Sequence, residues 1–191
     1  LKNLSIKIKT KNPKIIINNY EQIELKEVSS NILISSYFQN KFAIKNLSIN
    51  SKSNEISNYI NLYRTIDNSI QIILLNQFVK SGTAQINVDI SFEDSGRIKN
   101  NFHLTGKVLN AELQIPSNKN IKKLNFNFSI KENNYNFKKI LFNFNKINFE
   151  SDYLKIKEKS NKFFVKGNLK NKKNKTNNDL ILLIFNNNLG N

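Results

Sequence analysis

The chain has few side chains that could act as acids, bases or metal ligands. Its single histidine, His103, lies between Phe102 and Leu104 at a polar position of an alternating run. Paired carboxylates, or a carboxylate beside an imidazole, would support general acid–base catalysis or hold a metal ion. The carboxylates are instead scattered without a base or nucleophile beside them: Glu21, Glu24 and Glu27; Glu93 and Asp94; Glu150 and Asp152. We therefore predict that the protein is not an enzyme and holds no metal.

Two further kinds of site are excluded by composition. The chain has no cysteine, so it can form neither a disulfide framework, nor a thiolate metal site, nor a cysteine nucleophile. Its five glycines are far apart, which rules out a glycine-rich loop that would bind phosphate. We therefore expect no cofactor, and the function must reside in the extended elements of the fold rather than in a compact cluster of residues.

Asparagine, lysine and isoleucine dominate the composition, with 37, 28 and 27 copies in 191 residues, and the net charge is +16. Such a charge is typical of proteins that bind nucleic acid or anionic lipid. Nucleic-acid readers use arginine for bidentate contacts, however, and Arg64 and Arg97 are isolated. The lysine excess is better explained by A/T-rich codons. We therefore expect no nucleic-acid partner. Nucleic-acid binding through the lysine surface is kept as a third alternative for the function. The positive charge also favours nearness to anionic membranes.

Apolar residues recur at every second position along most of the chain, which predicts strands with one apolar face. The partners on the other face are Asn, Lys, Ser and Asp, as in antiparallel meanders with one wet side. Turn residues separate the runs, as in Glu93–Gly96 and Glu132–Asn134. Separate strands are predicted for Phe102–Val108 and Ala111–Ile115, among roughly ten to twelve in total. The fold class predicted is mainly β, with a long antiparallel twisted sheet.

One segment, around residues 54–80, has helical rather than strand periodicity. Its apolar residues are spaced by three and four, Ser53 or Asn54 can cap its start, Gly82 follows its end, and Asp67–Asn68 can break it. We expect its stripe to pack against the sheet, at one end or over one edge. The alternative is a role at a membrane surface. The stripe consists of Ile56, Ile60, Tyr63, Ile70 and Leu74.

The chain therefore divides into strands over 1–52, a helical insertion over 53–80, antiparallel strands over 81–170, a basic loop over 171–179 and a terminal strand over 180–185. It begins with Leu1 and contains no methionine, so we interpret residues 1–191 as a single interior segment of a longer protein. The longest apolar run is Leu180–Phe185, far short of the ~20 residues that a spanning helix needs. We expect no transmembrane segment within this chain.

The stretch from Ser81 to Pro116 resembles the periplasmic repeats of the AsmA-like family of Gram-negative envelope proteins. The resemblance rests on a glycine that opens a long alternating strand, a turn that ends in a second glycine, and a second alternating strand. The preceding strand and helix also fit the family. The matching segments are Phe42–Ile49, Asn58–Arg64, Ser81–Gly82, Ala84–Phe92, Gly96, Thr105–Val108 and Ala111–Leu113.

The resemblance implies a sheet curled into an open groove with an apolar concave face. It also implies a periplasmic location, an inner-membrane anchor helix upstream of this chain, and a role in moving phospholipid between membranes or supporting outer-membrane assembly. Phospholipid acyl chains would be the ligand, and other envelope proteins are expected partners. The residues expected to line the groove are Ala84, Ile86, Val88, Ile90, Phe92, Phe102, Leu104, Val108, Leu113, Leu124, Phe126, Phe128, Ile130, Phe142 and Phe144.

A second interpretation of the same alternation is a structural or adhesin-like β-sandwich or solenoid, whose apolar face is a sealed core. The two interpretations differ in one geometric respect. A sealed core buries the Phe and Ile side chains fully, whereas a conduit leaves a contiguous apolar furrow larger than an ordinary surface patch. An acyl chain needs only such a furrow, because it has no hydrogen-bonding groups to satisfy.

Overall fold

The computed structural model describes residues 4–18, 21–116, 119–160 and 162–171. The predicted strand over 180–185 and all but the first residue of the predicted basic loop over 171–179 lie outside these residues. The described strands are β1 (Ser5–Lys11), β2 (Lys14–Ile16), β3 (Gln22–Leu33), β4 (Ile44–Ser51), β5 (Asn54–Glu55), β6 (Val79–Ser91), β7 (His103–Ile115), β8 (Lys119–Lys131), β9 (Asn134–Phe144), β10 (Ile147–Lys159), β11 (Lys162–Gly167) and β12 (Lys170–Asn171). The described helices are α1 (Ile34–Phe38), α2 (Ile56–Arg64) and α3 (Ile70–Phe78).

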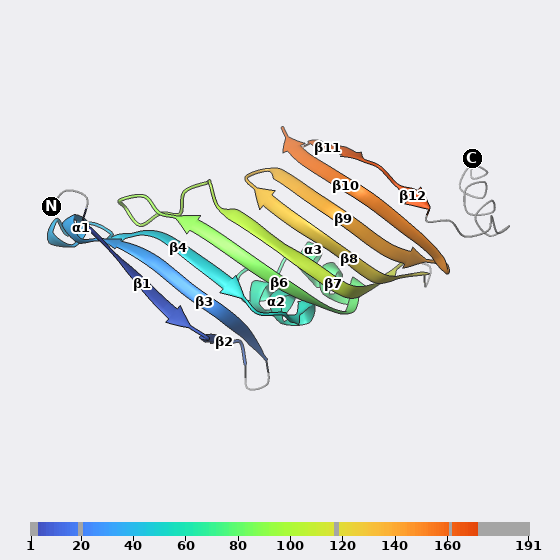
Figure 1. Ribbon diagram of the computed structural model, residues 1–191, viewed down its shortest axis with the longest axis horizontal. Coiled ribbons are helices and arrows are strands. Elements are labelled where there is room, and N and C mark those ends of the chain that lie inside the picture. Colours follow the sequence, from blue (N-terminus) through green and yellow to red (C-terminus); the bar gives the residue numbers. More distant parts are fainter. Residues whose placement is uncertain (1–3, 19–20, 117–118, 161, 172–191) are drawn as a thin grey trace.

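All described strands belong to one open antiparallel sheet, as Figure 1 shows. The order along the sheet is β1-β3-β4-β6-β7-β8-β9-β10-β11, with β2 beside β3, β5 beside β6 and β12 beside β10. Strands β1 and β11 are therefore its two edges and do not pair with each other. This confirms the predicted fold class, a mainly β protein with a long antiparallel sheet. No helix among the described residues is long and apolar enough to cross a membrane.

Strand β7 joins two runs that the sequence predicted as separate strands. Leu104–Val108 and Ala111–Ile115 alternate in opposite phase, and the structure links them through a β-bulge at Leu109–Asn110. Asn110 takes a left-handed conformation with φ of 51°. A bulge adds one residue to a strand and so returns the side chains after it to the original face. The phase shift in the sequence marks a bulge, and the prediction of two strands was wrong.

The same device occurs in the next two strands. Lys123 in β8 and Lys139 in β9 have φ of 52° and 53°, at the points where their apolar runs change phase. The register between these strands shifts at the same level. Asn125 supports two of the bulges, because its Oδ1 accepts the N–H of Asn110 at 3.0 Å and its Nδ2 donates to the carbonyl of Lys123 at 2.6 Å. Bulges bend strands and increase their twist, so a row of them bends the sheet along one line.

The helical insertion is present and broken as predicted, with α2 and α3 separated by residues 65–69. Its predicted ends were wrong. Glu55 is the N-cap of α2, in place of Ser53 or Asn54. Gly82 lies inside β6 with φ of 127°, and a Cβ there would lie 2.6 Å from the Cα of Ala111. Glycine is required here because β6 and β7 approach too closely for a side chain, and not because a helix ends.

Helix α2 packs on the apolar face of the sheet beside β6 (Figure 1). Ile60 is 5% exposed, and Ile56 and Tyr59 contact a buried cluster of Ala84, Val108 and Ala111. The predicted stripe ends there. Its other members, Tyr63, Ile70 and Leu74, are exposed, so the prediction that the whole stripe packs on the sheet was wrong. The break at residues 65–69 redirects α3, and that helix has too many apolar residues to bury them all on one side.

Candidate functional site: the apolar face of the sheet

Cross-strand register places one row of mostly apolar side chains across the whole sheet. Residues that pair directly in antiparallel strands project from the same face. Following these pairs from β1 to β11 gives an unbroken series of partners. We call this series the apolar row: Thr10, Val28, Ile49, Val88, Leu104, Ile130, Tyr135, Ile156 and Val165.

A second row runs beside the first from β6 to β11. It consists of Ile86, Gly106, Phe128, Phe137, Leu154 and Gly167. The aromatic side chains of this region contact one another: Phe126 and Phe137 meet edge to face at 5.7 Å, and Phe126 and Phe128 lie 6.2 Å apart. Aromatic pairs in these geometries add to the stability of the face beyond their buried area. The two rows form one continuous apolar surface.

The predicted groove residues are in most cases neither sealed in a core nor freely exposed. Ala84 and Val108 are buried beneath α2, at 4% and 8% exposure. Phe102 is 39% exposed. The remaining predicted residues are half-buried: Ile86, Val88, Ile90, Phe92, Leu104, Leu113, Leu124, Phe126, Phe128, Ile130, Phe142 and Phe144. Partial burial of this kind is what one layer of neighbouring side chains gives without a second layer above it.

Two predicted groove residues lie outside the strands. Phe92 follows β6, forms a β-bridge with Ile98 and packs its ring 5.3 Å from that of Phe42. Phe102 precedes β7 and lines a hollow of about 830 Å³ with Tyr135, in which the other lining residues are polar or charged. The alternating run Ala84–Phe92 therefore extends one residue past the end of β6, which lies at Ser91. These two phenylalanines belong to the connection between β6 and β7.

The structure adds residues to this face that were not among the predicted groove residues. A hollow of about 390 Å³ opens near the β11 edge, lined by the predicted Phe142 and by three residues that were not predicted, Ile140, Leu154 and Leu169. Its polar wall includes Asn168, whose Oδ1 accepts the N–H of Asp152 at 3.0 Å. Ile140 continues the alternation of Phe142 and Phe144, and Leu154 alternates with Ile156, so the alternating pattern was the signal that could have added both to the groove residues.

A buried polar network fixes the start of α2 on the sheet. Tyr59 donates its hydroxyl to Ser51 Oγ at 2.6 Å, and Ser51 Oγ in turn accepts the N–H of Ile86 at 2.8 Å. Asn54 binds both backbone groups of Glu24: its Oδ1 accepts the N–H at 2.7 Å, and its Nδ2 donates to the carbonyl at 3.0 Å. Buried polar groups must find such partners to avoid a large penalty. This network positions the helix at one end of the apolar face.

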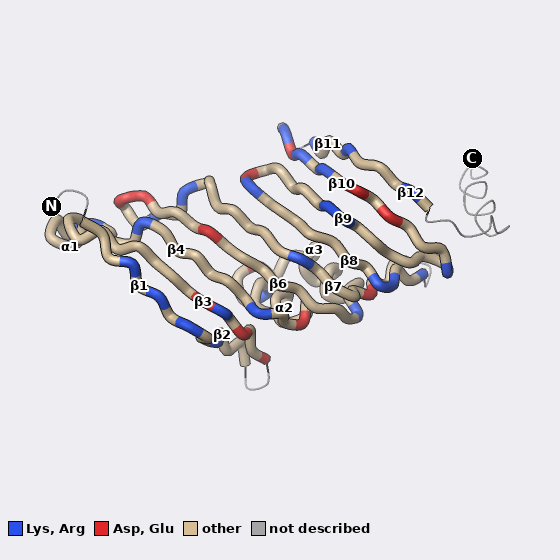
Figure 2. The backbone as a smooth tube through the Cα atoms, in the orientation of Figure 1, with Lys and Arg blue, Asp and Glu red and all other residues tan. Residues whose placement is uncertain are grey.

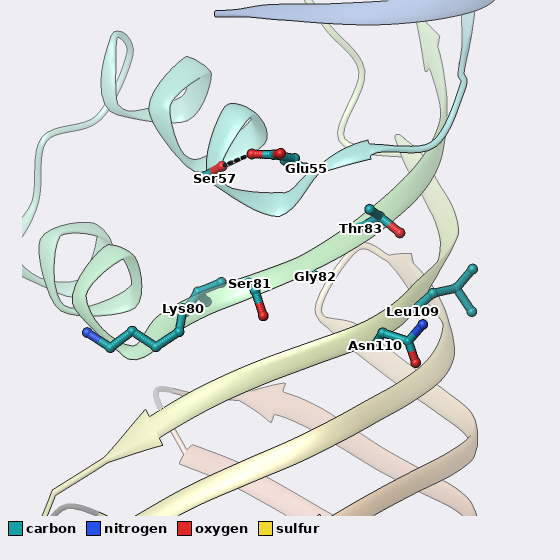
Figure 3. Close-up of a pocket in the computed structure, with 9 residues that line it drawn as sticks. Glu55, Ser57, Lys80, Ser81, Gly82, Thr83, Leu109 and Asn110 are labelled. Atoms are coloured by element: carbon teal, nitrogen blue, oxygen red, sulfur yellow. Dashed lines mark hydrogen bonds between the residues drawn. The ribbon is translucent and has the colours of Figure 1, made fainter.

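The opposite face is polar and contains no catalytic grouping among the described residues. Figure 3 shows a hollow of about 450 Å³ there, whose lining includes Glu55, Lys80, Thr83 and Leu109. Thr83 and Leu109 pair across β6 and β7, one position from Ala84 and Val108, so they project to the other side. The only side-chain bond drawn within the hollow joins Ser57 Oγ to Glu55 at 3.3 Å. That pair is an ordinary contact at the start of a helix.

The candidate acids and bases of the sequence remain dispersed. His103 contacts Ser129 Oγ at 3.1 Å through its Nε2. Lys170, followed by Asn168, donates hydrogen bonds that hold the pKa of Asp152 below its ordinary value of 3.8. Lys45 likewise lowers the pKa of Asp94. No group of three or more His, Asp or Glu side chains in the described part of the chain could hold a metal ion.

Comparison of this chain with protein-family models, with curated proteins and with solved structures finds no match.

Proposed function

We propose that this chain is a non-enzymatic lipid-binding segment, whose apolar face holds phospholipid acyl chains as part of a conduit between the inner and outer membranes. The observation that carries the proposal is the apolar row, which is half-buried from Val28 in β3 to Ile156 in β10 and is exposed only at its two edge residues, Thr10 and Val165. The described helices contact β3, β5, β6 and β7. Among the described residues no second sheet covers the face.

The dimensions of the row suit an acyl chain. Nine strands at a spacing of about 4.8 Å give a track of roughly 40 Å. The hydrocarbon of one bilayer leaflet is only about 15 Å thick, half of the full hydrocarbon core. Each methylene transferred from water to such a track gains about 0.8 kcal/mol. A continuous track without polar partners therefore suits acyl chains better than it suits a small polar ligand.

The sealed-core alternative predicts full burial of the same side chains. The half-buried state of Val88, Leu104 and Ile130 in a single-layer sheet favours the open face instead. Location in the periplasm, an anchor upstream, other envelope proteins as partners and a role in outer-membrane assembly form part of this proposal. They rest on the AsmA-like resemblance alone.

A photo-crosslinking experiment in cells tests the proposal. A photoreactive residue at Val88 or Leu104, which pair across β6 and β7, should capture phospholipid. The matched controls are Asn87 and Thr105, which pair with each other in the same strands and project to the opposite face. Equal capture from both pairs would contradict a lipid track on one face. Absence of lipid from Val88 and Leu104 would reject the proposal itself.

A further inference from the structure

The helical insertion exposes apolar side chains that the sheet does not use. Tyr63 in α2, Ile66 in the connection and Ile70, Leu74 and Leu75 in α3 are 49%, 79%, 62%, 40% and 45% exposed. We call these five residues the helical patch. Ile70 and Leu74 are four positions apart and therefore share one face of α3. Helix α3 contains no charged residue and is apolar on nearly all sides.

The connection between the two helices is held by its own hydrogen bonds. The backbone N–H groups of Ile66 and Asp67 both donate to the carbonyl of Tyr63 at 2.9 Å. Thr65 Oγ1 donates to the carbonyl of Leu62 at 2.7 Å, and Asp67 Oδ1 accepts the N–H of Ser69 at 2.9 Å. Ile66 is thus presented to solvent from a hydrogen-bonded turn. Its exposure is built into the fold.

Lysines gather at the same end of the sheet. On β6 to β10, the strand ends on the side of α3 contribute five lysines and two carboxylates, and one of the carboxylates, Glu112, pairs with Lys122 at 3.3 Å. The opposite ends of these strands and their connections mix both signs: Arg97, Lys99, Lys131, Lys157 and Lys159 with Glu93, Asp94, Glu132 and Glu158. Figure 2 shows this arrangement. The lysines on the side of α3 are Lys80, Lys119, Lys122, Lys123 and Lys146.

We propose that the helical patch and these lysines form a docking surface for an anionic lipid bilayer. Apolar side chains beside a helix enter the boundary between headgroups and acyl chains, while lysines around them attract anionic headgroups. Helix α3 has nine residues, so it would lie in the interface and not cross the bilayer. A second copy of this chain is a poorer occupant, because its lysines would face those of the first. The proposal does not depend on lipid binding by the apolar face.

Sedimentation with vesicles tests the apolar part of the surface. The purified 191-residue chain is mixed with vesicles of phosphatidylcholine alone or of equimolar phosphatidylcholine and phosphatidylglycerol. We expect binding only to the anionic vesicles, weakened by salt. Ile66→Asp should weaken binding to the anionic vesicles about tenfold or more, because the isoleucine side chain that would enter the bilayer is lost and a negative charge is added. Ile98→Asp is the matched control, since Ile98 is 56% exposed in the connection between β6 and β7, away from the start of β6 where the helices end.

A second pair of variants tests the charged part. Replacing Lys80 and Lys119 with glutamine should weaken binding to anionic vesicles and flatten its salt dependence. Replacing Lys131 and Lys159 at the opposite end removes the same charge and should change binding far less. Thermal unfolding should be nearly unchanged in all of these variants, because every substituted side chain is exposed.

Three results would overturn the proposal: no binding of the wild type to anionic vesicles, equal binding by Ile66→Asp and the wild type, or equal losses from both lysine pairs. Self-association that Ile66→Asp abolishes, without any vesicle binding, would identify the helical patch as a contact between copies and would likewise reject a bilayer. None of these results bears on photo-crosslinking from Val88 and Leu104, so the proposed function would be judged separately.

Discussion

The ring of Phe128 lies over Gly106, its cross-strand partner in the second apolar row. A Cβ at Gly106 would lie 2.6 Å from Cζ of that ring, closer than real Cβ atoms approach other carbons. Packing of an aromatic ring on a facing glycine fills the gap that the glycine leaves in the sheet. The Phe128 ring therefore occupies the space that a side chain at position 106 would take, and the apolar surface continues across β7 between β6 and β8.

Gly106→Val should therefore destabilise the protein by about 1–3 kcal/mol, the usual cost of forcing extra methyl groups into a packed site, because a Cβ there would meet the backbone carbonyl oxygen of Gln85 as well as the Phe128 ring. Urea unfolding followed by circular dichroism measures the change. Thr105→Val is the matched control, because Thr105 is the next residue of the same strand and its side chain projects to the polar face. An unchanged midpoint for Gly106→Val would show that neither the Phe128 ring nor the backbone of Gln85 restricts position 106, and that the pair does not shape the face.

The two halves of the predicted helical stripe should respond differently to charge. Ile60 is 5% exposed and Ile70 is 62% exposed. Ile60→Asp should cost about 3 kcal/mol or more, since it buries an unpaired carboxylate, whereas Ile70→Asp should stay within about 0.5 kcal/mol. Thermal unfolding of the two single variants makes the comparison. Equal losses would mean that α3 packs as tightly as α2.

The ion pair between Asp152 and Lys170 links the β10 strand to the β12 strand at 2.7 Å. Hydrogen bonds from Lys170 and then Asn168 lower the pKa of Asp152, and the bond with Asp152 raises the pKa of Lys170. The stabilisation from Asp152 is present above its ordinary pKa of 3.8 and is lost as the pH falls through the lowered pKa. The stabilisation from Lys170 is lost as the pH rises through its raised pKa.

Replacing Lys170 with glutamine tests this pairing. In Lys170→Gln, carboxyl NMR titration should show the pKa of Asp152 returning toward 3.8. An unchanged pKa of Asp152 would contradict the pairing.

The alternating pattern was enough to predict the strands, the mainly β antiparallel class and the face of most apolar residues, whereas the open form of the sheet was implied only by the AsmA-like resemblance. Its changes of phase were harder to interpret. The shift between Val108 and Ala111 suggested two strands, whereas left-handed Asn110 makes one bent strand of them. The reason is that a bulge and a turn both reset the alternation. Only the pairing partner, which lies far away in the sequence, distinguishes them.

The polar residues that hold the fold could not be identified from the sequence. Asn54 and Asn168 satisfy backbone groups of Glu24 and Asp152 across neighbouring segments. Asparagine fills about a fifth of the chain, so neither position differs from the others by residue type or local pattern. Tertiary pairing alone selects them. The exposed half of the helical insertion escaped prediction for a related reason, since a helix that is apolar on nearly all sides does not reveal which side packs.

Binding of a fluorescent phospholipid to the purified chain tests the lipid track most directly. Leu104 and Ile130 pair across β7 and β8 on the apolar face, and Thr105 and Ser129 pair beside them on the polar face. We predict that replacing Leu104 and Ile130 with asparagine weakens binding about tenfold or more, because it removes most of two apolar contacts. The same replacement at Thr105 and Ser129 should leave binding unchanged, with both variants folded by circular dichroism. Equal affinity in the two double variants, or no binding by the wild type, would contradict a lipid track on this face.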